Sequence, residues 1–241
     1  MSPPERALVI VPTYNERENI ARLIDNVLQQ DERIDVLVVD DGSPDGTGEI
    51  VDRIALENPR VHAHHRPRKL GLGTAYIEGF RWALERSYEF VFEMDADFSH
   101  DPGHLPQFLA AAKDADLVLG SRYVPGGAIP NWGALRRFIS RGGCLYAQLL
   151  LQTRVRDLTG GFKCYRRAVL EAIDLDAIRS KGYAFQIETT YRALRRGFRV
   201  AEVPISFVDR EVGGSKMSRS IVLEAIWKVP LLRLAALRGT L

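Results

Sequence analysis

Two aspartates separated by one residue are the side chains of this chain best suited to catalysis. Asp95 and Asp97 follow a mainly apolar run, and in an extended segment residues two apart point to the same side. Two carboxylates held together repel each other, so a hard divalent cation, Mg²⁺ or Mn²⁺, shared with a substrate diphosphate is a natural partner. The alternative is a turn and helix cap after a strand, because Ser-His-Asp-Pro follows at residues 99–102.

A second polar cluster, Pro-Thr-Tyr-Asn-Glu at residues 12–16, follows the first apolar run. The ring of Tyr14 can stack on a nucleotide base, and the carboxylate of Glu16 can accept hydrogen bonds from base N–H groups. Asn15 and Glu18 also have the spacing of a helix-capping box, and both interpretations can hold together.

A third cluster, Asp-Asp-Gly-Ser at residues 40–43, ends another apolar run. Its carboxylates can accept hydrogen bonds from the base and ribose of a nucleotide, as acidic groups at strand ends do in nucleotide-binding folds. A strand end with its turn and helix cap is the alternative. The Gly-Leu-Gly segment at residues 71–73 lacks the pattern of a phosphate loop, so we interpret it as a helix start packed close to the sheet.

Basic side chains in the second part of the chain could hold another phosphate. Arg122 ends a further apolar run, and Arg136, Arg137 and Arg141 lie on a helix predicted at residues 134–151. The same helix has an apolar surface formed by Leu135, Phe138, Ile139, Leu145 and Leu149. Basic and apolar groups together suit a phosphorylated lipid at an interface, and an ordinary amphipathic helix is the alternative.

The C-terminal region contains a glycine-rich loop and a last helical stretch. Arg210 and Lys216 flank Gly-Gly-Ser, and this loop could close over a diphosphate and offset its charge, or remain a solvated loop. Residues 218–241 are apolar over most of a predicted helical surface. This helix could lie in a membrane surface or pack into the core.

Cysteines and histidines indicate no metal centre of their own. Cys144 and Cys164 are far apart and unlike a zinc, redox or secreted disulfide pattern, which favours a reducing cytosol. His62, His64 and His65 fall in a predicted strand without a carboxylate or cysteine at ligand spacing, so we interpret them as strand residues.

The elements that position these residues alternate in the first 130 residues. Short apolar runs are followed by amphipathic stretches at 15–28, 46–56, 73–86 and 105–113. Such β-α units predict an α/β fold, with a mostly parallel sheet covered by helices on both faces and ligands beyond the carboxyl ends of the strands. The polar clusters at those ends should therefore converge on one site.

Composition predicts one globular domain over residues 1–241. The motifs divide it into a nucleotide-sugar-binding half at 1–125 and an acceptor- and membrane-facing half at 126–241. Of the 241 residues, 46% are hydrophobic and 27% charged, and no run reaches the roughly 20 apolar residues of a membrane span. The net charge is −9 over residues 1–130 (13 Lys/Arg against 22 Asp/Glu) and +11 over 131–241 (20 against 9). A basic half suits an anionic membrane, phosphate-bearing substrates or nucleic acid, but no nucleic-acid-binding module is recognisable.

Taken in order, seven segments carry a more specific signal. They are VPTYNERENI, VVDDGSPDGT, GLGTAYIEGF, EMDADFSHDP, GSRYVPGG, DLTGGFKCYRR and DREVGGSKM. Together they resemble the dolichol-phosphate (polyprenol-phosphate) mannose synthases of glycosyltransferase family 2, which are inverting enzymes with the GT-A fold. The resemblance covers nearly the whole chain.

The resemblance implies a role for each matching residue. The guanosine nucleotide would be held by Pro12, Tyr14, Glu16, Val39 and Asp41. The donor would be contacted by Asp95, Ala96 and Asp97, with Asp97 the chief metal ligand, and its diphosphate gripped by Arg210 and Lys216. The acceptor phosphate would be held by Arg122, Arg136 and Ser140, and the catalytic set is Asp95, Asp97 and Arg122.

Two departures from the family pattern qualify this assignment. Some relatives have a glutamine as second metal ligand two residues after the position of Asp97, where this chain has Ser99, which could reach a metal through water. Many relatives also add transmembrane helices, and this chain ends at Leu241. We therefore expect a peripheral protein on the cytosolic face of a membrane, with a separate membrane-anchoring protein as a candidate partner.

The expected reaction is transfer of mannose from GDP-mannose to a polyprenyl phosphate with inversion, assisted by Mg²⁺ or Mn²⁺. A polyprenyl-phosphate transferase that uses a UDP-sugar is the nearest alternative, because the VDDGS and DAD motifs do not separate donors. A non-catalytic subunit of a membrane complex is the alternative from another class. The simultaneous presence of Asp95, Asp97, Arg122 and Lys216 argues against it.

Overall fold

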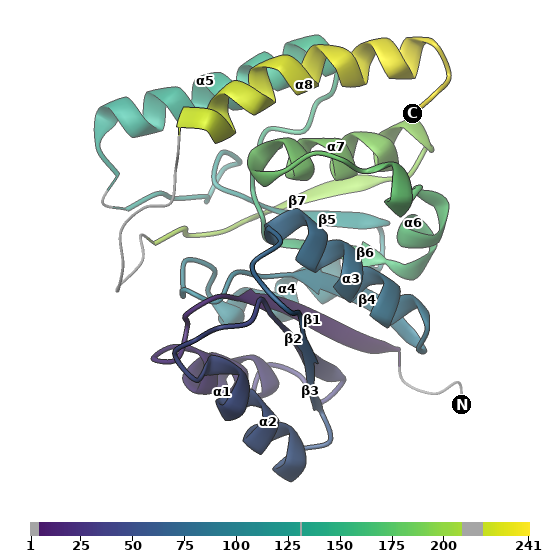
Figure 1. Cartoon of the computed structure of the whole chain (residues 1–241). Helices are drawn as coiled ribbons and strands as arrows, with labels where there is room; N and C mark the ends of the chain where they lie inside the picture. Colours follow the sequence, from purple (N-terminus) through teal and green to yellow (C-terminus); the bar gives the residue numbers. More distant parts are fainter. Residues whose placement is uncertain (1–4, 131, 209–218) are drawn as a thin grey trace.

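A seven-stranded sheet in the order β3-β2-β1-β4-β6-β5-β7 runs through the molecule (Figure 1). The computed structural model describes residues 5–130, 132–208 and 219–241. The strands are β1 (Arg6–Thr13), β2 (Ile34–Asp40), β3 (Val61–His65), β4 (Tyr88–Glu93), β5 (Leu117–Ser121), β6 (Lys163–Arg166) and β7 (Val200–Pro204). The helices are α1 (Ile20–Leu28), α2 (Thr47–Glu57), α3 (Leu72–Leu84), α4 (Leu105–Ala111), α5 (Ala134–Leu151), α6 (Arg167–Ala172), α7 (Gly182–Arg195) and α8 (Arg219–Leu237), with short 3₁₀ turns η1 (Pro102–His104) and η2 (Leu175–Ala177).

The predicted mostly parallel sheet is confirmed, with one strand that the sequence pattern does not reveal. Strands β1 to β4 pair in parallel, and so do β5 and β7, but β6 lies antiparallel between β4 and β5. β6 has only four residues, and two of them, Lys163 and Arg166, are charged, so it lacks an apolar run. Because β4 and β5 both oppose β6, their carboxyl ends still reach the same edge of the sheet.

Helices cover both faces of the sheet, as predicted. One core cluster packs α3 and α7 against the sheet and extends to α5 and α8, while the other packs α1 and α4 on the opposite face. The contact between α3 and β1 is close, since a Cβ atom added to Gly79 would lie 2.7 Å from Cγ2 of Ile10. Glycine is therefore needed where α3 crosses β1.

The first helix begins later than predicted, and the expected capping box does not form. α1 starts at Ile20, and its N-cap residue, Asn19, makes no side-chain capping hydrogen bond. Asn15 instead has a φ of 60°, in the left-handed region that asparagine tolerates. The carbonyl of Glu16 accepts the N–H groups of Asn19 and Ile20, so a turn separates β1 from the helix.

Helices α5 and α8 lie side by side above α7 and run in the same direction (Figure 1). The Tyr146 hydroxyl on α5 donates to the carbonyl of Ile226 on α8 at 2.8 Å, and Lys181 N–H at the start of α7 donates to Glu224 of α8 at 2.9 Å. The last helix therefore packs against the protein along one side. Within the described ranges, no helix combines the length and hydropathy that crossing a bilayer requires.

The outer sides of α5 and α8 expose large apolar side chains. These are Leu135, Phe138, Ile139, Leu145 and Leu149 on α5, and Ile226, Trp227, Leu231, Leu234 and Leu237 on α8. The apolar surface predicted for residues 134–151 thus stays exposed and is extended by α8. We call these ten residues the apolar platform.

Candidate active site

The carboxyl ends of the strands bring the predicted polar clusters to one edge of the sheet. The Thr13 hydroxyl at the end of β1 donates to the Asp40 carboxylate at the end of β2, at 2.8 Å. At Gly161, in the loop before β6, an added Cβ atom would lie 4.0 Å from an Asp95 carboxylate oxygen. This loop also contains Asp157, which binds Arg122 after β5. The four predicted clusters therefore lie at the same edge of the sheet, and contacts link them in two pairs.

The acidic cluster after β2 is tied to the loop before α3. Asp41 accepts a hydrogen bond from Arg66 Nη1 at 2.6 Å on one oxygen and from Leu70 N–H at 3.2 Å on the other. Arg66 also donates to the Thr74 hydroxyl. The Asp41 carboxylate thus orders residues 66–74, which leaves fewer of its lone pairs for a nucleotide than the sequence suggested.

The other residues assigned to the nucleotide lie around the ends of β1 and β2. Pro12 is half-buried in β1, whereas the side chain of Val39 is fully buried in the core. The ring of Tyr14 lies 4.2 Å from the Lys69 ammonium, and the Glu16 carboxylate accepts a hydrogen bond from the Asn19 side chain. Tyr14 and Glu16 are only partly buried and thus accessible at the strand ends.

Asp95 and Asp97 occupy the end of β4 and are held by nearby side chains. The Tyr76 hydroxyl donates to Asp95 at 3.3 Å, and the backbone N–H of Asp95 donates to Nδ1 of His100 at 3.2 Å. Burial lowers the pKa of His100, which favours the neutral imidazole that can accept at Nδ1. Ala96, between the two aspartates, is buried.

The donor set at Asp95 and Asp97 fits a metal ion that is shared with a substrate. The described part of the chain contains no group of three or more His, Cys, Asp or Glu side chains arranged to hold an ion. Mg²⁺ and Mn²⁺ typically take one or two carboxylates and complete their shells with water and phosphate oxygens. Ser99, which the sequence suggested could reach a metal through water, donates its hydroxyl to Asp97 at 2.5 Å and so orients that carboxylate.

Arg122 is anchored in the protein by a buried ion pair. Its Nε and Nη2 donate to the two carboxylate oxygens of Asp157, each at 2.7 Å, and Nη2 also donates to Thr159 at 2.8 Å. Burial opposes both charges, but the pairing outweighs it, so the pKa of Arg122 is raised and that of Asp157 is lowered. Arg122 Nη1 has no hydrogen-bond partner among the described residues and remains available for a ligand.

The three residues assigned to the acceptor phosphate are joined by aromatic side chains. The guanidinium of Arg136 stacks 3.9 Å from the ring centre of Trp132, and that of Arg122 lies 5.7 Å from the same ring. The Tyr123 hydroxyl donates to Ser140 at 2.7 Å. Arg122, Arg136 and Ser140 therefore belong to one cluster at the start of α5.

Several residues of this site could not be found by sequence reasoning. Asp157 stood in a recognised motif, but nothing in the sequence paired it with Arg122. Tyr76, His100 and Trp132 had no charge or spacing that marked them as functional. Of the predicted residues, Arg210 and Lys216 lie outside the described residues.

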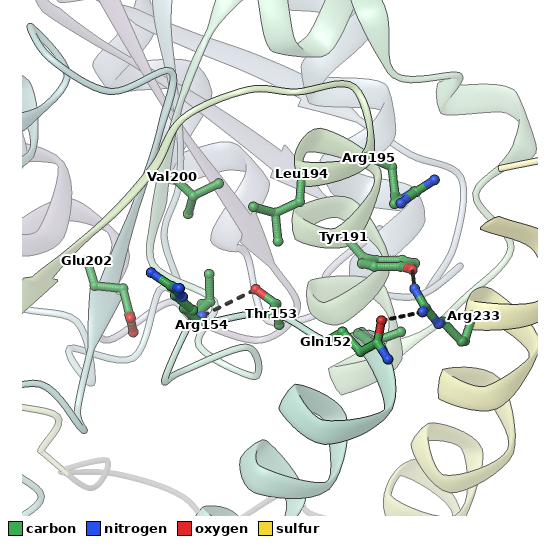
Figure 2. A pocket seen from close by; sticks show the side chains of 11 residues that line it. Gln152, Thr153, Arg154, Tyr191, Leu194, Arg195, Val200, Glu202 and Arg233 are labelled. Carbon is green, nitrogen blue, oxygen red and sulfur yellow. Dashed lines mark hydrogen bonds between the residues drawn. The ribbon is translucent and has the colours of Figure 1, made fainter. Parts of the chain in front are cut away.

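A cavity of about 490 Å³ lies between the C-terminal ends of α5 and α7 (Figure 2). None of the predicted site residues that the structure describes lines it. On one wall, Arg233 of α8 donates to the Tyr191 hydroxyl at 3.4 Å, and Glu202 forms part of the opposite side (Figure 2). The Glu202 carboxylate accepts the backbone N–H groups of Arg156 and Asp157, at 2.8 and 2.9 Å. It therefore supports the loop that anchors Arg122.

Comparisons with known proteins show the family of this chain. Residues 8–174 match the model of glycosyl transferase family 2. The undecaprenyl-phosphate mannosyltransferase of Micrococcus luteus is 53% identical over 96% of this chain and 95% of its own length. The polyprenol monophosphomannose synthase of Mycolicibacterium smegmatis is 52% identical over 94% of this chain and 86% of its own length.

A solved structure shows the same fold at low sequence identity. Glucosyl-3-phosphoglycerate synthase from Mycobacterium tuberculosis, in complex with Mn²⁺, UDP-glucose and phosphoglyceric acid, superposes with a TM-score of 0.66 and 17% identity. The match covers 94% of this chain and 80% of that one. The fold is the expected GT-A fold. With curated relatives more than half identical along nearly its whole length, this glycosyltransferase belongs to glycosyl transferase family 2, among the polyprenyl-phosphate mannose synthases.

Proposed function

We propose that the protein transfers mannose from GDP-mannose to a polyprenyl phosphate at a membrane surface and inverts the anomeric configuration. The observation that carries the proposal is the presence of two groups of side chains at the same edge of the sheet. Asp95 and Asp97 lie at one end of the site, and the Arg122–Arg136–Ser140 cluster lies beside the apolar platform. The names of the two close relatives support the transfer of mannose to a polyprenyl phosphate.

Charge neutralisation and positioning account for the chemistry. The acceptor phosphate is already an anion at neutral pH, so its oxygen needs no general base before it attacks the anomeric carbon. Arg122 and Arg136 would hold that phosphate, and an ordered arrangement of this kind lowers the entropic cost of bringing two substrates together. Because a single displacement passes through an in-line arrangement, the new bond forms on the opposite face of the sugar and the configuration inverts.

The departing nucleotide diphosphate needs positive charge as its bond to the sugar breaks. Asp97, with Asp95 nearby, would hold Mg²⁺ or Mn²⁺, which supplies Lewis-acid stabilisation of the diphosphate. Arg210 and Lys216 are assigned to the same diphosphate by the family resemblance. Tyr14, Glu16 and the end of β2 would bind the guanosine.

The apolar platform would place the acceptor cluster at the membrane. A polyprenyl chain is insoluble in water, and its phosphate lies at the level of the lipid headgroups. Exposed apolar residues beside Arg136, Arg137 and Arg141 suit an anionic membrane surface from which the phosphate reaches the site. We propose that the protein is peripheral on the cytosolic face.

The experiment is a transfer assay with purified protein, undecaprenyl phosphate, Mg²⁺ and either GDP-mannose or UDP-glucose. We expect lipid-linked mannose from GDP-mannose and no comparable product from UDP-glucose. Stabilisation of the protein against heat by GDP but not by UDP would support the same donor choice. A preference for the UDP-sugar would replace the proposed donor, and absence of any lipid-linked sugar would reject the reaction.

A further inference from the structure

An unpaired hydrogen-bond donor lies inside the acceptor cluster. The side chain of Trp132 is buried, with 6% of its surface exposed, and its Nε1 atom has no hydrogen-bond partner among the described residues. Buried polar groups are nearly always hydrogen-bonded, because an unpaired group has lost its water without a replacement. An indole N–H can only donate, so the missing partner must be an acceptor.

The neighbours of the indole select the kind of acceptor. Arg136 stacks on the ring at 3.9 Å, and Arg122 lies 5.7 Å from its centre. Arg122 forms an ion pair with Asp157, but its Nη1 has no hydrogen-bond partner among the described residues. Two guanidinium groups beside one N–H favour an anion with several oxygens over a neutral carbonyl or water.

A series of aromatic contacts connects this donor to the segment that contains Asp95 and Asp97. The Trp132 ring meets Phe207 edge to face at 5.6 Å, and Phe207 meets His100 in the same way at 5.6 Å. His100 in turn accepts the backbone N–H of Asp95. Trp132 is therefore linked through Phe207 and His100 to the backbone of Asp95.

We propose that the indole N–H of Trp132 donates a hydrogen bond to the phosphate of the polyprenyl acceptor, between the guanidinium groups of Arg122 and Arg136. This inference rests on the proposed function and adds a substrate-binding residue to it. A donor in a fixed ring adds a directional contact to those of the two guanidinium groups and so restricts the orientation of the phosphate further. Trp132 thereby helps to aim one phosphate oxygen at the sugar.

The first test uses Trp132→Phe, which keeps an aromatic ring under Arg136 and removes only the N–H. With farnesyl phosphate as a short acceptor, we expect the KM for the acceptor to rise about tenfold, the effect of losing one hydrogen bond to a charged group. The KM for GDP-mannose should change less than about twofold. Trp82→Phe is the matched control, because Trp82 lies away from the site against Tyr88 and Arg86 and should leave both constants unchanged. An unchanged acceptor KM in Trp132→Phe would overturn the inference.

The second test needs no substitution in the measured protein. The chain has three tryptophans, so ¹⁵N-labelled protein should show three indole N–H signals, each assigned by its Trp→Phe variant. Farnesyl phosphate should move the Trp132 signal downfield, whereas farnesol should leave it in place. Saturation with farnesyl phosphate without a shift at Trp132 would contradict the inference, even if the variant folds poorly.

These outcomes also separate the inference from the function on which it depends. Normal transfer of mannose by both wild type and Trp132→Phe, with equal acceptor KM values, would remove only the role of Trp132. A wild-type protein that neither transfers mannose nor binds farnesyl phosphate would overturn the proposed function, and the inference with it.

Discussion

Arg122 and Asp157 form a buried, two-point ion pair, with Arg122 Nε and Nη2 each 2.7 Å from a carboxylate oxygen of Asp157. The backbone N–H of Arg122 donates to the same carboxylate at 3.0 Å, so the pair fixes both the side chain and the strand end. The arginine is thus held in one orientation before any substrate arrives. A guanidinium placed in this way can receive a phosphate without a further loss of side-chain entropy.

Replacing Asp157 by Asn should therefore damage both stability and acceptor binding. It leaves a buried guanidinium without its counter-charge, which typically costs about 3–5 kcal/mol of unfolding free energy. Urea unfolding measures this loss. Glu171→Gln, which removes the exposed ion pair with Arg167, is the control and should cost less than about 1 kcal/mol. Equal effects of the two changes would show that the buried pair is not an anchor.

The crossing of α3 over β1 should not accept a side chain larger than glycine. In Gly79→Ala the new methyl group would overlap Ile10, and the repacking should destabilise the fold by about 1–3 kcal/mol. Gly142→Ala is the matched control, because nothing lies within 4 Å of an added Cβ on that part of α5. It should stabilise by about 0.5–1 kcal/mol, since alanine is the better helix former. Thermal unfolding of both variants shows whether the two changes in stability have opposite signs.

Alkaline pH should weaken the fold through Cys144, whose thiol packs against Asp157 and Thr159. Burial, and then the charge of Asp157, raise the pKa of Cys144 from 9.0 to about 11. Between about pH 9 and 11 the native thiol keeps its proton, whereas the unfolded thiol has lost it. The contribution of the Cys144 thiol to the free energy of unfolding is therefore complete below pH 9 and disappears as the pH rises to about 11.

A shift of this size corresponds to at most about 3 kcal/mol. Cys144→Ser keeps a donor beside Asp157 but does not titrate in this range, so its unfolding free energy should fall less steeply between pH 9 and 11. Urea titrations at several pH values compare the two slopes. Parallel slopes for wild type and Cys144→Ser would contradict the assigned pKa.

Membrane binding should depend on the apolar platform. Phe138, with 76% of its surface exposed, should insert into the interfacial layer, and Phe138→Glu should reduce sedimentation with phosphatidylglycerol vesicles about tenfold or more. Leu56→Glu is the control, because Leu56 is 87% exposed on α2, which covers the opposite face of the sheet. Equal binding by wild type and Phe138→Glu would argue against this surface as the membrane contact.

The sequence predicted those features that depend on local pattern. Apolar periodicity and turn residues were enough to locate the strands that precede Asp41, Asp97 and Arg122. The same signals gave the full length of α5. Strand β6 could not, because its four residues include two charged ones and its place is decided by pairing with β4 and β5. Tertiary pairing overrides local preference at such short segments.

The start of α1 was missed for a related reason. A capping-box spacing at Asn15 competes with the turn around Glu16, and the hydrogen bonds of Glu16 to Asn19 and Thr47 favour the turn. Contacts between residues that are distant in the sequence also cannot be predicted from local sequence patterns. Asp157 lies 35 residues from Arg122 in the sequence. The N–H of Trp132 can be recognised as a binding group only because Arg122 and Arg136 lie next to its ring in space.

The proposed reaction is tested most directly by the formation of lipid-linked mannose by wild type and by Asp97→Asn, measured with GDP-mannose, undecaprenyl phosphate and Mg²⁺. Asparagine keeps the size of the side chain and removes the charge proposed to hold the ion. Wild-type transfer should stop when EDTA removes the metal and return when Mg²⁺ or Mn²⁺ is restored. In Asp97→Asn the rate should fall about a hundredfold or more, without loss of fold. Transfer that persists in EDTA, or that is undiminished in Asp97→Asn, would rule out the proposed metal-assisted reaction.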